Sequence, residues 1–541
     1  MQAQEVSGLA LDNTDPVPRP GSAQIKIDVN AEPPDNAFIS SHDISSQDHT
    51  PFIRSELFAN TPITVFADER EALSVARDLA EMKTAQGDNY PFYVMDMGRL
   101  ESLLRSWREH LPRVQPFYSI RCNADPVLLR LLVEQPDIGF YCTNRAELNL
   151  AVELAGEKRV VYANPLWTRG NVRHARELGV DMLIFENYDD LVRMHSLHPT
   201  ASLVLRVCMN APIDEQLIGN GCKLNEEAHR LLSLAADIGV KVVGISFSIG
   251  TGACSVGIYS YAIAQARHLF DVATAMGHEM SVLDIGGGFT YASHARGGPS
   301  FEQIANTINV CLDEYFDECS FAHVRIIAEP GRYFAASVFS LVTNIINKRA
   351  VDASSVTNNV YDSGSAGFVY QTNEGFYGSF GCRLTSHCEP KCRPLIYSDN
   401  IHELSSSTTY ATILGPTLNN DIDVVQSVAR LPQMQVGEWL LWDDMGAYSM
   451  GNRETLGEDN GYASPTVYYF VGDKRWQHMS RPSTPERASN LGTDGCSSSS
   501  QKRGGGTETE VDSHSLDSAE SVSAVTDDER LWTDFEHWLR Q

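Results

Sequence analysis

Residues 115–155 decide the fold and read QPFYSIRCNADPVLLRLLVEQPDIGFYCTNRAELNLAVELA. A short apolar run, QPFYSI, is followed by a helical pattern in DPVLLRLLVEQ, and a second apolar run, IGFYCT, is followed by another helical pattern in NRAELNLAVELA. Short runs rich in β-branched and aromatic residues predict strands, and apolar residues three or four apart predict helices. This alternation is typical of parallel strands joined by helices.

The same alternation continues along the chain, where further strand-like runs are RVVYAN, MLIFEN, SLVLRV, VVGISFS, SVLDIGG and VRIIAEP. Helical stretches such as TRGNVRHARELG and YDDLVRMHSL separate most of them. Eight strand-like segments between about residues 92 and 340 predict a parallel (β/α)₈ barrel, an α/β fold. Beyond about residue 340, runs such as LVTNIINKRAV and EWLLWDDMGAYSM are punctuated by Gly, Asn and Pro, which predicts a second, mostly antiparallel β-domain.

Composition excludes several classes of function. The 541 residues carry a formal net charge of -28, which disfavours binding to nucleic acid and to anionic membranes. The eleven cysteines show neither C-x-x-C pairs nor nearby histidines in metal-ligand order, so we predict no disulfide framework and no metal site. The first thirty residues lack the basic and apolar regions of a signal peptide, and no window approaches 18 uninterrupted apolar residues. We therefore expect a cytoplasmic protein, with the nucleus as an additional location.

Both ends of the chain differ in composition from its middle. Residues 1–60 are rich in Asp, Pro, Ser and Gln, and residues 480–541 form an acidic tail rich in Ser and Thr, so we predict two disordered tails. The last fifteen residues, DDERLWTDFEHWLRQ, place large apolar side chains at helical spacing and predict a short terminal helix, which docks on the chain's own core or contacts a partner.

Two motifs follow barrel strands, at the end where such barrels place their reacting groups. The first contains Gly286, Gly287 and Gly288, whose backbone N–H groups can approach a phosphate without interference from a Cβ atom. The second places Glu329 and Arg332 at the same mouth, where they would suit a pyridinium nitrogen and a phosphate. The alternatives are a plain turn for the glycines and an internal salt bridge for the charged pair.

These motifs belong to a longer series. PFYVMDMGRL, PFYSIRCN, VVYANP, SFSIGTG, LDIGGGF, IIAEPGRYF, YGSF, LGPT and DMGAY occur in this order between about residues 91 and 479. In this order they resemble the signatures of the eukaryotic ornithine decarboxylase family, which includes the antizyme inhibitors. The resemblance implies an alanine-racemase-like barrel over 94–340 that binds pyridoxal phosphate (PLP), and a β-domain over 341–479 to which residues 61–93 contribute.

The lysine on which the family's chemistry depends is missing. In the family, the segment that resembles residues 116–123 carries a lysine that forms a Schiff base with PLP, and this chain has Arg121 there. A guanidinium group stays protonated and is a poor nucleophile, so it cannot form that bond. The resemblance thus predicts that PLP binds noncovalently, if at all, and that no covalent cofactor is present.

Other positions depart from the family pattern as well. Ser248 replaces a histidine that stacks on the cofactor, and Tyr141 replaces a small acidic residue near it. Leu418 and Asn419 stand where the family has the cysteine that donates a proton and the aspartate that binds the distal amine of the substrate. Glu374 keeps a carboxylate on the substrate side. The residues that the resemblance retains for holding the cofactor are Gly286, Gly287, Gly288, Glu329, Arg332 and Tyr448.

Three functions follow from the resemblance. The first, which we predict, is a catalytically inactive regulator of polyamine metabolism that resembles antizyme inhibitors, which bind antizyme and so spare active ornithine decarboxylase. The second is an inactive subunit that tunes an active paralogue of ornithine decarboxylase. The third is a divergent PLP-dependent decarboxylase in putrescine biosynthesis, for which a nucleophile, a stacking ring, a proton donor and an amine anchor would all need replacements.

A docking surface for antizyme is expected over residues 144–181, the stretch that resembles the family's antizyme-binding region. Basic side chains together with a tryptophan that we expect to be exposed suit an acidic partner. An ordinary solvated helix face is the alternative. The candidate residues are Arg145, Lys158, Arg159, Trp167, Arg169, Arg173, His174 and Arg176.

Overall fold

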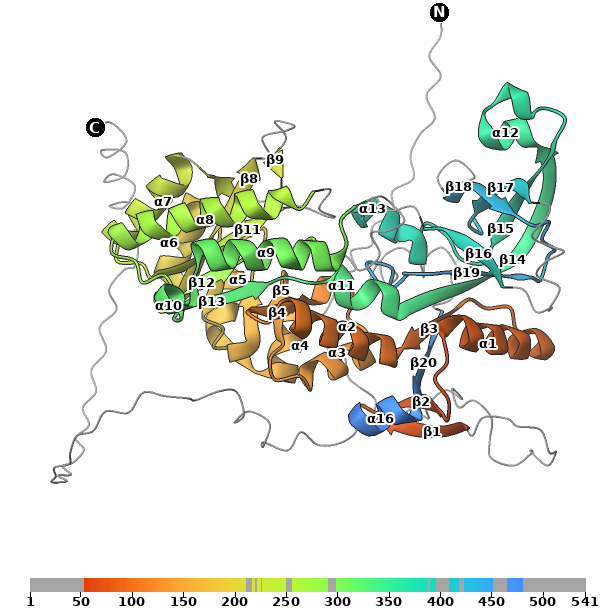
Figure 1. Ribbon diagram of the computed structural model, residues 1–541, viewed down its shortest axis with the longest axis horizontal. Helices are drawn as coiled ribbons and strands as arrows, with labels where there is room; N and C mark the ends of the chain where they lie inside the picture. The colour runs from red at the N-terminus through yellow and green to blue at the C-terminus, as the bar shows by residue number, and fades with distance from the viewer. Residues whose placement is uncertain are drawn as a thin grey trace, which may run out of the picture. The chain divides into compact units, whose positions relative to one another are not determined.

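The computed structural model describes residues 53–479 apart from 211–216, 219–220, 225, 250–254, 290–297, 387–389, 396–407, 418–422 and 451–464 (Figure 1). The tail predicted over 480–541, with its terminal helix, lies outside the described residues, as do Leu418 and Asn419. Within the described residues, no helix has the length and apolar character that crossing a membrane requires.

Eight parallel strands close into a barrel, which confirms the predicted fold class. The closure is made by β13 and β4, where Ile326 pairs with Val114. In order around the barrel, the strands are β4 (Val114–Ser119), β5 (Gly139–Cys142), β6 (Val160–Tyr162), β7 (Met182–Phe185), β8 (Ser202–Asn210), β11 (Val242–Ser248), β12 (Val282–Asp284) and β13 (Arg325–Ala328). Each of the eight predicted strand segments overlaps one of these strands. Two short strands, β9 (Leu217–Ile218) and β10 (Cys222–Lys223), pair with β8.

The barrel interior is filled with side chains. One residue from each strand joins a separate buried cluster, and Tyr141 of β5 is its member from that strand. The eight are Phe117, Tyr141, Val161, Ile184, Val204, Val243, Val282 and Ile327. The interior is therefore a packed core, and its reactive end is set by the loops above that layer.

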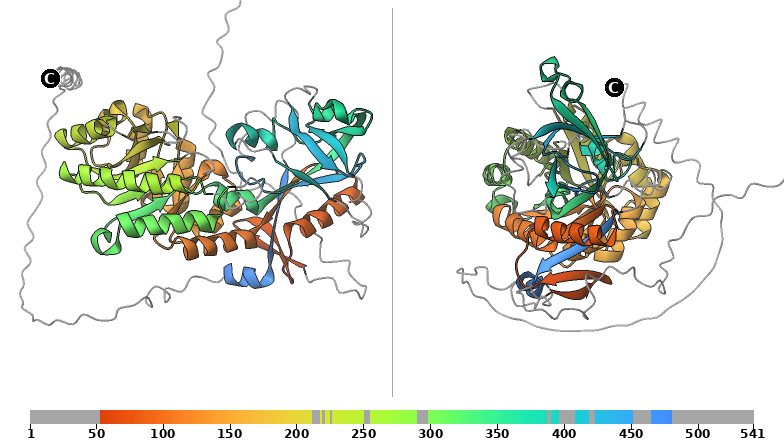
Figure 2. Two further views of the ribbon diagram at one scale, coloured as in Figure 1. Left: turned by 45° about the horizontal axis from the view of Figure 1, so that its top comes forward. Right: turned by 90° about the vertical axis from the view of Figure 1, so that its right-hand side faces the viewer.

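Helices lie outside the barrel strands (Figures 1 and 2). Their starts follow from local sequence, because Asp125, Asn144, Thr168 and Asn187 each accept a hydrogen bond from a backbone N–H in the first turn of the helix that follows. The helices around the barrel are α2 (Met97–His110), α3 (Pro126–Val133), α4 (Arg145–Ala155), α5 (Arg169–Glu177), α6 (Tyr188–Leu197), α7 (Glu226–Asp237), α8 (Gly257–Ala275), α9 (Phe301–Tyr315) and α10 (Glu318–Phe321).

The second sheet is mostly antiparallel, as predicted. Its order is β1 (Ile53–Phe58), β2 (Thr61–Phe66), β20 (Thr466–Gly472), β3 (Phe92–Asp96), β14 (Phe339–Asp352), β15 (Ala366–Thr372), β17 (Thr409–Leu414) and β18 (Val424–Leu431). In addition, β19 (Trp439–Trp442) pairs with β14, and β16 (Cys392–Leu395) pairs with β19. Strands that precede the barrel in sequence thus join strands that follow it. The parallel pairs are β2–β20, β20–β3 and β15–β17.

Further elements complete the described chain. They are α1 (Ala72–Gln86), α11 (Arg332–Ala335), α12 (Ala353–Thr357), α13 (Cys382–Ser386) and α16 (Asp473–Met479), with 3₁₀ turns η1 (Ile120–Cys122), η2 (Glu157–Arg159), η4 (Ala336–Val338), η5 (Val360–Asp362) and η6 (Ser379–Gly381).

The predicted N-terminal tail is too long. Strand β1 begins at Ile53, inside the 1–60 segment for which we predict disorder, and it pairs antiparallel with β2. The ring of Phe58 packs edge-to-face on Trp476 of α16, with 5.9 Å between centroids, and Arg54 pairs with Asp473 of the same helix at 2.6 Å. Periodicity missed this strand because its own run is short and because the side chains of α16 on which it packs lie about 400 residues away in sequence.

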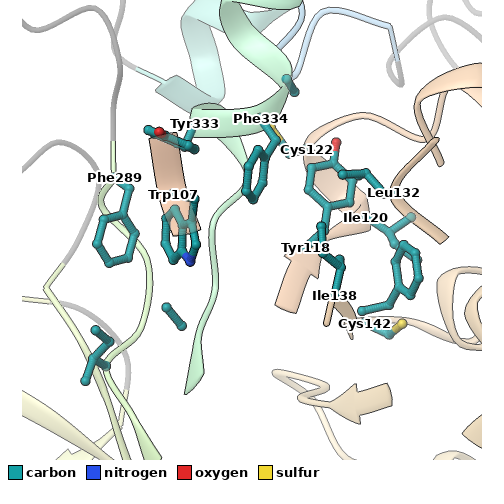
Figure 3. Close-up of a cluster of buried hydrophobic side chains, with 14 of the residues drawn as sticks. Trp107, Tyr118, Ile120, Cys122, Leu132, Ile138, Cys142, Phe289, Tyr333 and Phe334 are labelled. Carbon is teal, nitrogen blue, oxygen red and sulfur yellow. The ribbon is translucent and has the colours of Figure 1, made fainter. Parts of the chain in front are cut away.

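An aromatic cluster supports the loops after β12 and β13. The indole of Trp107 on α2 is fully buried and lies between Phe289 and Phe334 (Figure 3). Its ring centroid is 4.9 Å from that of Phe289 and 5.6 Å from that of Phe334. Since Phe289 follows the glycine motif and Phe334 lies in α11, this cluster positions both predicted phosphate-binding motifs.

Candidate cofactor site and partner surface

The predicted cofactor-binding residues meet at one end of the barrel. Arg121 follows β4, Ser248 ends β11, the three glycines follow β12, and Glu329 follows β13. Arg332 starts α11 at the same mouth, and Tyr448 reaches it from the loop after β19. All lie at the carboxyl ends of the strands, where barrels of this type build their sites.

The glycine turn has a conformation that a larger residue would strain. Gly286 has φ +67° and Gly288 has φ +94°. A Cβ atom on Gly286 would lie 2.1 Å from the carbonyl oxygen of Phe247, and the Asp284 carboxylate accepts the Gly286 N–H at 2.9 Å. These glycines are therefore required by the backbone itself, whether or not a phosphate binds.

Arg332 has a side chain suited to binding a phosphate. Its guanidinium carbon lies 4.9 Å from the centre of the Tyr448 ring. Its Nη2 atom is buried and has no hydrogen-bond partner among the described residues. A buried cationic donor without an acceptor is costly, and a bound phosphate oxygen would satisfy it. The chain thus fits the phosphate end of PLP.

Arg121 is held at the mouth by its neighbours. The carbonyl of Cys122 accepts a hydrogen bond from Tyr448 N at 2.8 Å, and the Asn123 side chain donates to Gly446 O at 2.8 Å. The Arg121 side chain is exposed, and its guanidinium carbon lies 5.9 Å from the centre of the Tyr448 ring. The loop that should present a lysine amine therefore presents a guanidinium group.

A buried polar network lies beside this loop, centred on a residue that sequence analysis missed. Arg206 of β8 is 8% exposed. Its Nη2 donates hydrogen bonds to the Tyr141 hydroxyl and to Glu329 Oε1. Its Nε is 3.3 Å from Ser246 Oγ, which in turn donates to Asp284 at 2.8 Å. A single arginine inside the apolar run SLVLRV was the signal that could have found it, because a buried charge needs partners.

The network shifts the pKa values of its members. Burial disfavours the charged form of Arg206, but Glu329, Tyr141 and Asp284 outweigh it and raise the pKa of the guanidinium group. Burial raises the pKa of Glu329, while the Arg206 charge favours the ionised form of that carboxyl group. Burial also raises the pKa of the Tyr141 hydroxyl. Glu329 is thus engaged inside the protein, which supports the internal salt bridge that we considered, with Arg206 rather than Arg332 as its partner.

The ring end of the cofactor therefore fits less well than its phosphate end. Tyr141 is 3% exposed and belongs to the interior layer of the barrel, so its phenol takes space beside the mouth. Ser248 is half-buried and offers no ring for stacking. The Glu329 carboxylate already accepts from Arg206.

The Glu374 carboxylate forms hydrogen bonds within its own loop. It follows β15, is 1% exposed, and accepts hydrogen bonds from the backbone N–H groups of Gly375 at 3.1 Å and Ser379 at 3.0 Å. The carboxylate closes its own loop, so the predicted substrate-side role has a structural alternative.

The predicted partner surface is only partly exposed. Trp167, expected as its exposed anchor, is 6% exposed, donates to Ile184 O at 2.9 Å and packs on Tyr162. That expectation is wrong, because the indole N–H finds its acceptor inside the barrel wall. Arg159 is also structural, since its guanidinium group donates to three backbone carbonyls.

A basic face of α5 remains. Arg169, Arg173 and Arg176 are exposed and lie three or four residues apart, so they share one side of the helix. Lys158 and Arg145 are exposed nearby in sequence, although Arg145 donates to Asn171 at 2.8 Å. His174 is half-buried and lies 2.7 Å from Asn149 Oδ1. Leu166, which directly precedes Trp167 in sequence, is 79% exposed and offers an apolar side chain where we expected the indole.

Comparison with known proteins identifies the family. Residues 97–336 match the family described as "Pyridoxal-dependent decarboxylase, pyridoxal binding domain". Ornithine decarboxylase of Caenorhabditis elegans is 35% identical over 433 residues, which cover 78% of this chain and 97% of that enzyme. The chain belongs to the ornithine decarboxylase family.

A further relative and two solved structures show the same similarity in sequence and fold. Antizyme inhibitor 2 of Xenopus laevis is 34% identical over 75% of this chain and 87% of that protein. Among solved structures, the arginine decarboxylase of Paramecium bursaria Chlorella virus superposes with a TM-score of 0.64 at 26% identity, covering 73% of this chain and all of that one. Ornithine decarboxylase from Entamoeba histolytica, at 23% identity and a TM-score of 0.56, shares the fold.

Proposed function

We propose that this chain is a catalytically inactive member of the ornithine decarboxylase family that regulates polyamine metabolism as antizyme inhibitors do. The observation that carries the proposal is Arg121, which stands at the barrel mouth where the family's motif has its lysine. A guanidinium group remains protonated and cannot act as the amine nucleophile.

The surroundings of Arg121 support the loss of activity. When bound, PLP supplies an electron sink for decarboxylation. Here Gly286–Gly288, Arg332 and Tyr448 would hold its phosphate, but Glu329 already pairs with Arg206, and the Tyr141 phenol is buried in the barrel interior. The chain's residues can thus bind and orient a phosphate without supplying the groups that the reaction needs.

The alternative of a divergent decarboxylase requires another lysine. Lys241 directly precedes β11 and so lies at the amino end of the strand, opposite the mouth. Lys223 pairs with Cys208 at the carboxyl end of β8, but its side chain is exposed and its segment does not match the lysine motif. Neither residue supports an active enzyme.

Capture of antizyme is supported by two observations. One is the similarity to antizyme inhibitor 2 over most of that protein. The other is the basic face of α5, since exposed arginines on a chain of net charge -28 suit an acidic partner.

The proposal is tested with purified ornithine decarboxylase that antizyme has inhibited. Adding this chain should restore CO₂ release from ornithine, because the chain competes for antizyme. Arg173→Glu should raise the concentration for half recovery by about tenfold, since it reverses a charge at the centre of the basic face. Arg349→Glu, a matched reversal at an exposed position of β14, should change nothing. Failure of the unaltered chain to restore any activity would exclude the antizyme role.

An inactive subunit that tunes a paralogue is a second candidate, favoured by an exposed apolar pair. Val360 and Tyr361 are 84% and 96% exposed in η5, and Asn359 fixes the turn by accepting the Tyr361 N–H. Sedimentation of this chain with active ornithine decarboxylase separates the candidates, because a tuning subunit forms a heterodimer and an antizyme inhibitor need not.

A further inference from the structure

We infer that Arg121 and Arg332 form a two-point anion site, which holds a short phosphate monoester bearing a carboxylate without any covalent bond. This inference deepens the proposed function, because it names the ligand class of the inactive site. It gives the arginine that replaces the lysine a binding role of its own.

Both guanidinium groups lie against the same side chain. The guanidinium carbon of Arg332 is 4.9 Å and that of Arg121 is 5.9 Å from the centre of the Tyr448 ring. Tyr448 is held in place, since its backbone has φ +59° and its N–H donates to Cys122 O at 2.8 Å. Both cations therefore lie within 6 Å of the centre of one ring whose position is fixed.

The Arg332 and Arg121 charges also both act on the Cys122 thiol. Burial raises the pKa of this thiol to about 12, and the Arg332 and Arg121 charges both act in the opposite direction. A Cβ atom on Gly331 would lie 2.9 Å from Cys122 Cβ, so the turn before Arg332 packs directly on the loop that carries Arg121. Two cations converge where the family's motif would place one cation and one amine that reacts.

Arg332 supplies the phosphate point. Its Nη2 atom is buried and has no hydrogen-bond partner among the described residues, and the glycine turn leaves backbone without side chains beside it. A phosphate oxygen is the acceptor that suits a planar guanidinium fork.

Arg121 supplies the carboxylate point. Its side chain is exposed at the mouth. The Arg121 charge acts to lower the pKa of Glu147, but that carboxylate already accepts hydrogen bonds from other donors. Glu147 accepts from Thr143 N at 2.6 Å and from the Asn144 side chain at 2.5 Å. The Arg121 guanidinium can thus bind a carboxylate of a ligand, and it repels an ammonium group at the same place.

The buried network around Tyr141 favours a short ligand. Its phenol belongs to the interior layer of the barrel, and Arg206 engages both its hydroxyl and Glu329. The Glu329 carboxylate, which would pair with the nitrogen of an aromatic ring, is therefore already engaged by Arg206. A short aliphatic ligand satisfies both cations without displacing this network.

The test measures binding to the full chain by calorimetry with four probes. 3-Phosphoglycerate carries both anions, glycerol 3-phosphate lacks the carboxylate, phosphoethanolamine carries an ammonium group instead, and glycerate lacks the phosphate. We expect 3-phosphoglycerate to bind about tenfold more tightly than glycerol 3-phosphate, because one charge-assisted contact is lost, and phosphoethanolamine and glycerate to bind most weakly.

Variants assign the two points. Arg121→Gln should reduce the preference for 3-phosphoglycerate over glycerol 3-phosphate to less than about twofold, whereas Arg332→Gln should weaken both probes. Arg349→Gln, on β14, should leave both affinities unchanged. The inference is overturned if none of the phosphate probes binds the unaltered chain, or if Arg121→Gln keeps the full preference. Because no probe involves antizyme or CO₂ release, these outcomes are independent of the antizyme assay.

Discussion

Gly286 carries a conformational requirement that is separate from any ligand. Its φ of +67° disfavours a side chain, and a Cβ atom would approach the Phe247 carbonyl oxygen to 2.1 Å. Because that oxygen belongs to the backbone of β11, it cannot move aside as a flexible side chain would. Strain and overlap therefore act together at this position.

Gly286→Ala should lower the free energy of unfolding by at least about 3 kcal/mol, whereas Gly239→Ala should lower it by about 1 kcal/mol. Gly239 is the matched control, because its φ is +72° and a Cβ atom there would have no neighbour within 4 Å. Urea unfolding of both variants gives the two values. Equal losses would show that the overlap with β11 has no cost.

The residues at the mouth divide into those that a motif reveals and those that it does not. The glycines, Glu329, Arg332 and Arg121 lie in short contiguous motifs, so the sequence predicts their common location. Arg206 has no motif, since its partners come from β5, β11, β12 and β13, and only the closed barrel brings them together. The burial of Trp167 was missed for the same reason, because its acceptor lies on β7 and no motif in the sequence indicates that contact.

At the scale of elements, Asn187 and Asp190 hold the first turn of α6 together. The Asn187 side chain accepts the Asp190 N–H at 3.0 Å, and its amide donates back to the Asp190 carboxylate at 2.9 Å. Burial is the main cause that raises the pKa of Asp190 to about 6. The folded chain therefore keeps a proton on this carboxyl group that the unfolded chain releases near its ordinary pKa of about 3.9.

The free energy of unfolding should consequently fall as the pH rises from about 4 to about 6. Below this window both states are protonated and the contribution of Asp190 is fully present; above it the folded carboxyl group is ionised and the contribution is lost. Asp190→Asn should remove this part of the pH dependence, and Asp189→Asn, at the exposed neighbour, should retain it. Urea midpoints measured across this range give the comparison, and an unchanged slope in Asp190→Asn would refute it.

Local periodicity predicted the barrel elements because each strand and its following helix are adjacent in sequence. The second sheet was less accessible to such analysis. Its order alternates strands from before and after the barrel, and β20 lies parallel between β2 and β3 although about 400 residues separate them in sequence. Strand β1 was assigned to a tail because its run is short, although its partner β2 follows it directly in sequence.

At the scale of the whole molecule, the barrel and the second sheet meet at the site. Asn123 of the barrel donates to Gly446, and Cys122 accepts from Tyr448, so the loop after β19 is fastened to the loop that carries Arg121. This connection holds the loop that carries Arg121 in place at the mouth of the barrel. The proposal of an inactive regulator rests on this frame together with the presence of Arg121 in the loop where we expect the family's lysine.

The most direct test of this account is the mass of the purified full chain after incubation with PLP and borohydride, measured together with CO₂ release from ornithine. We predict no mass increase beyond that of Arg349→Lys, the control for reaction at surface lysines, and no CO₂ release. Arg121→Lys should gain one adduct, because a lysine amine condenses with the aldehyde and the reduced bond is stable. A site-specific adduct on the unaltered chain, together with CO₂ release, would mean that another lysine serves as the nucleophile and would contradict the account.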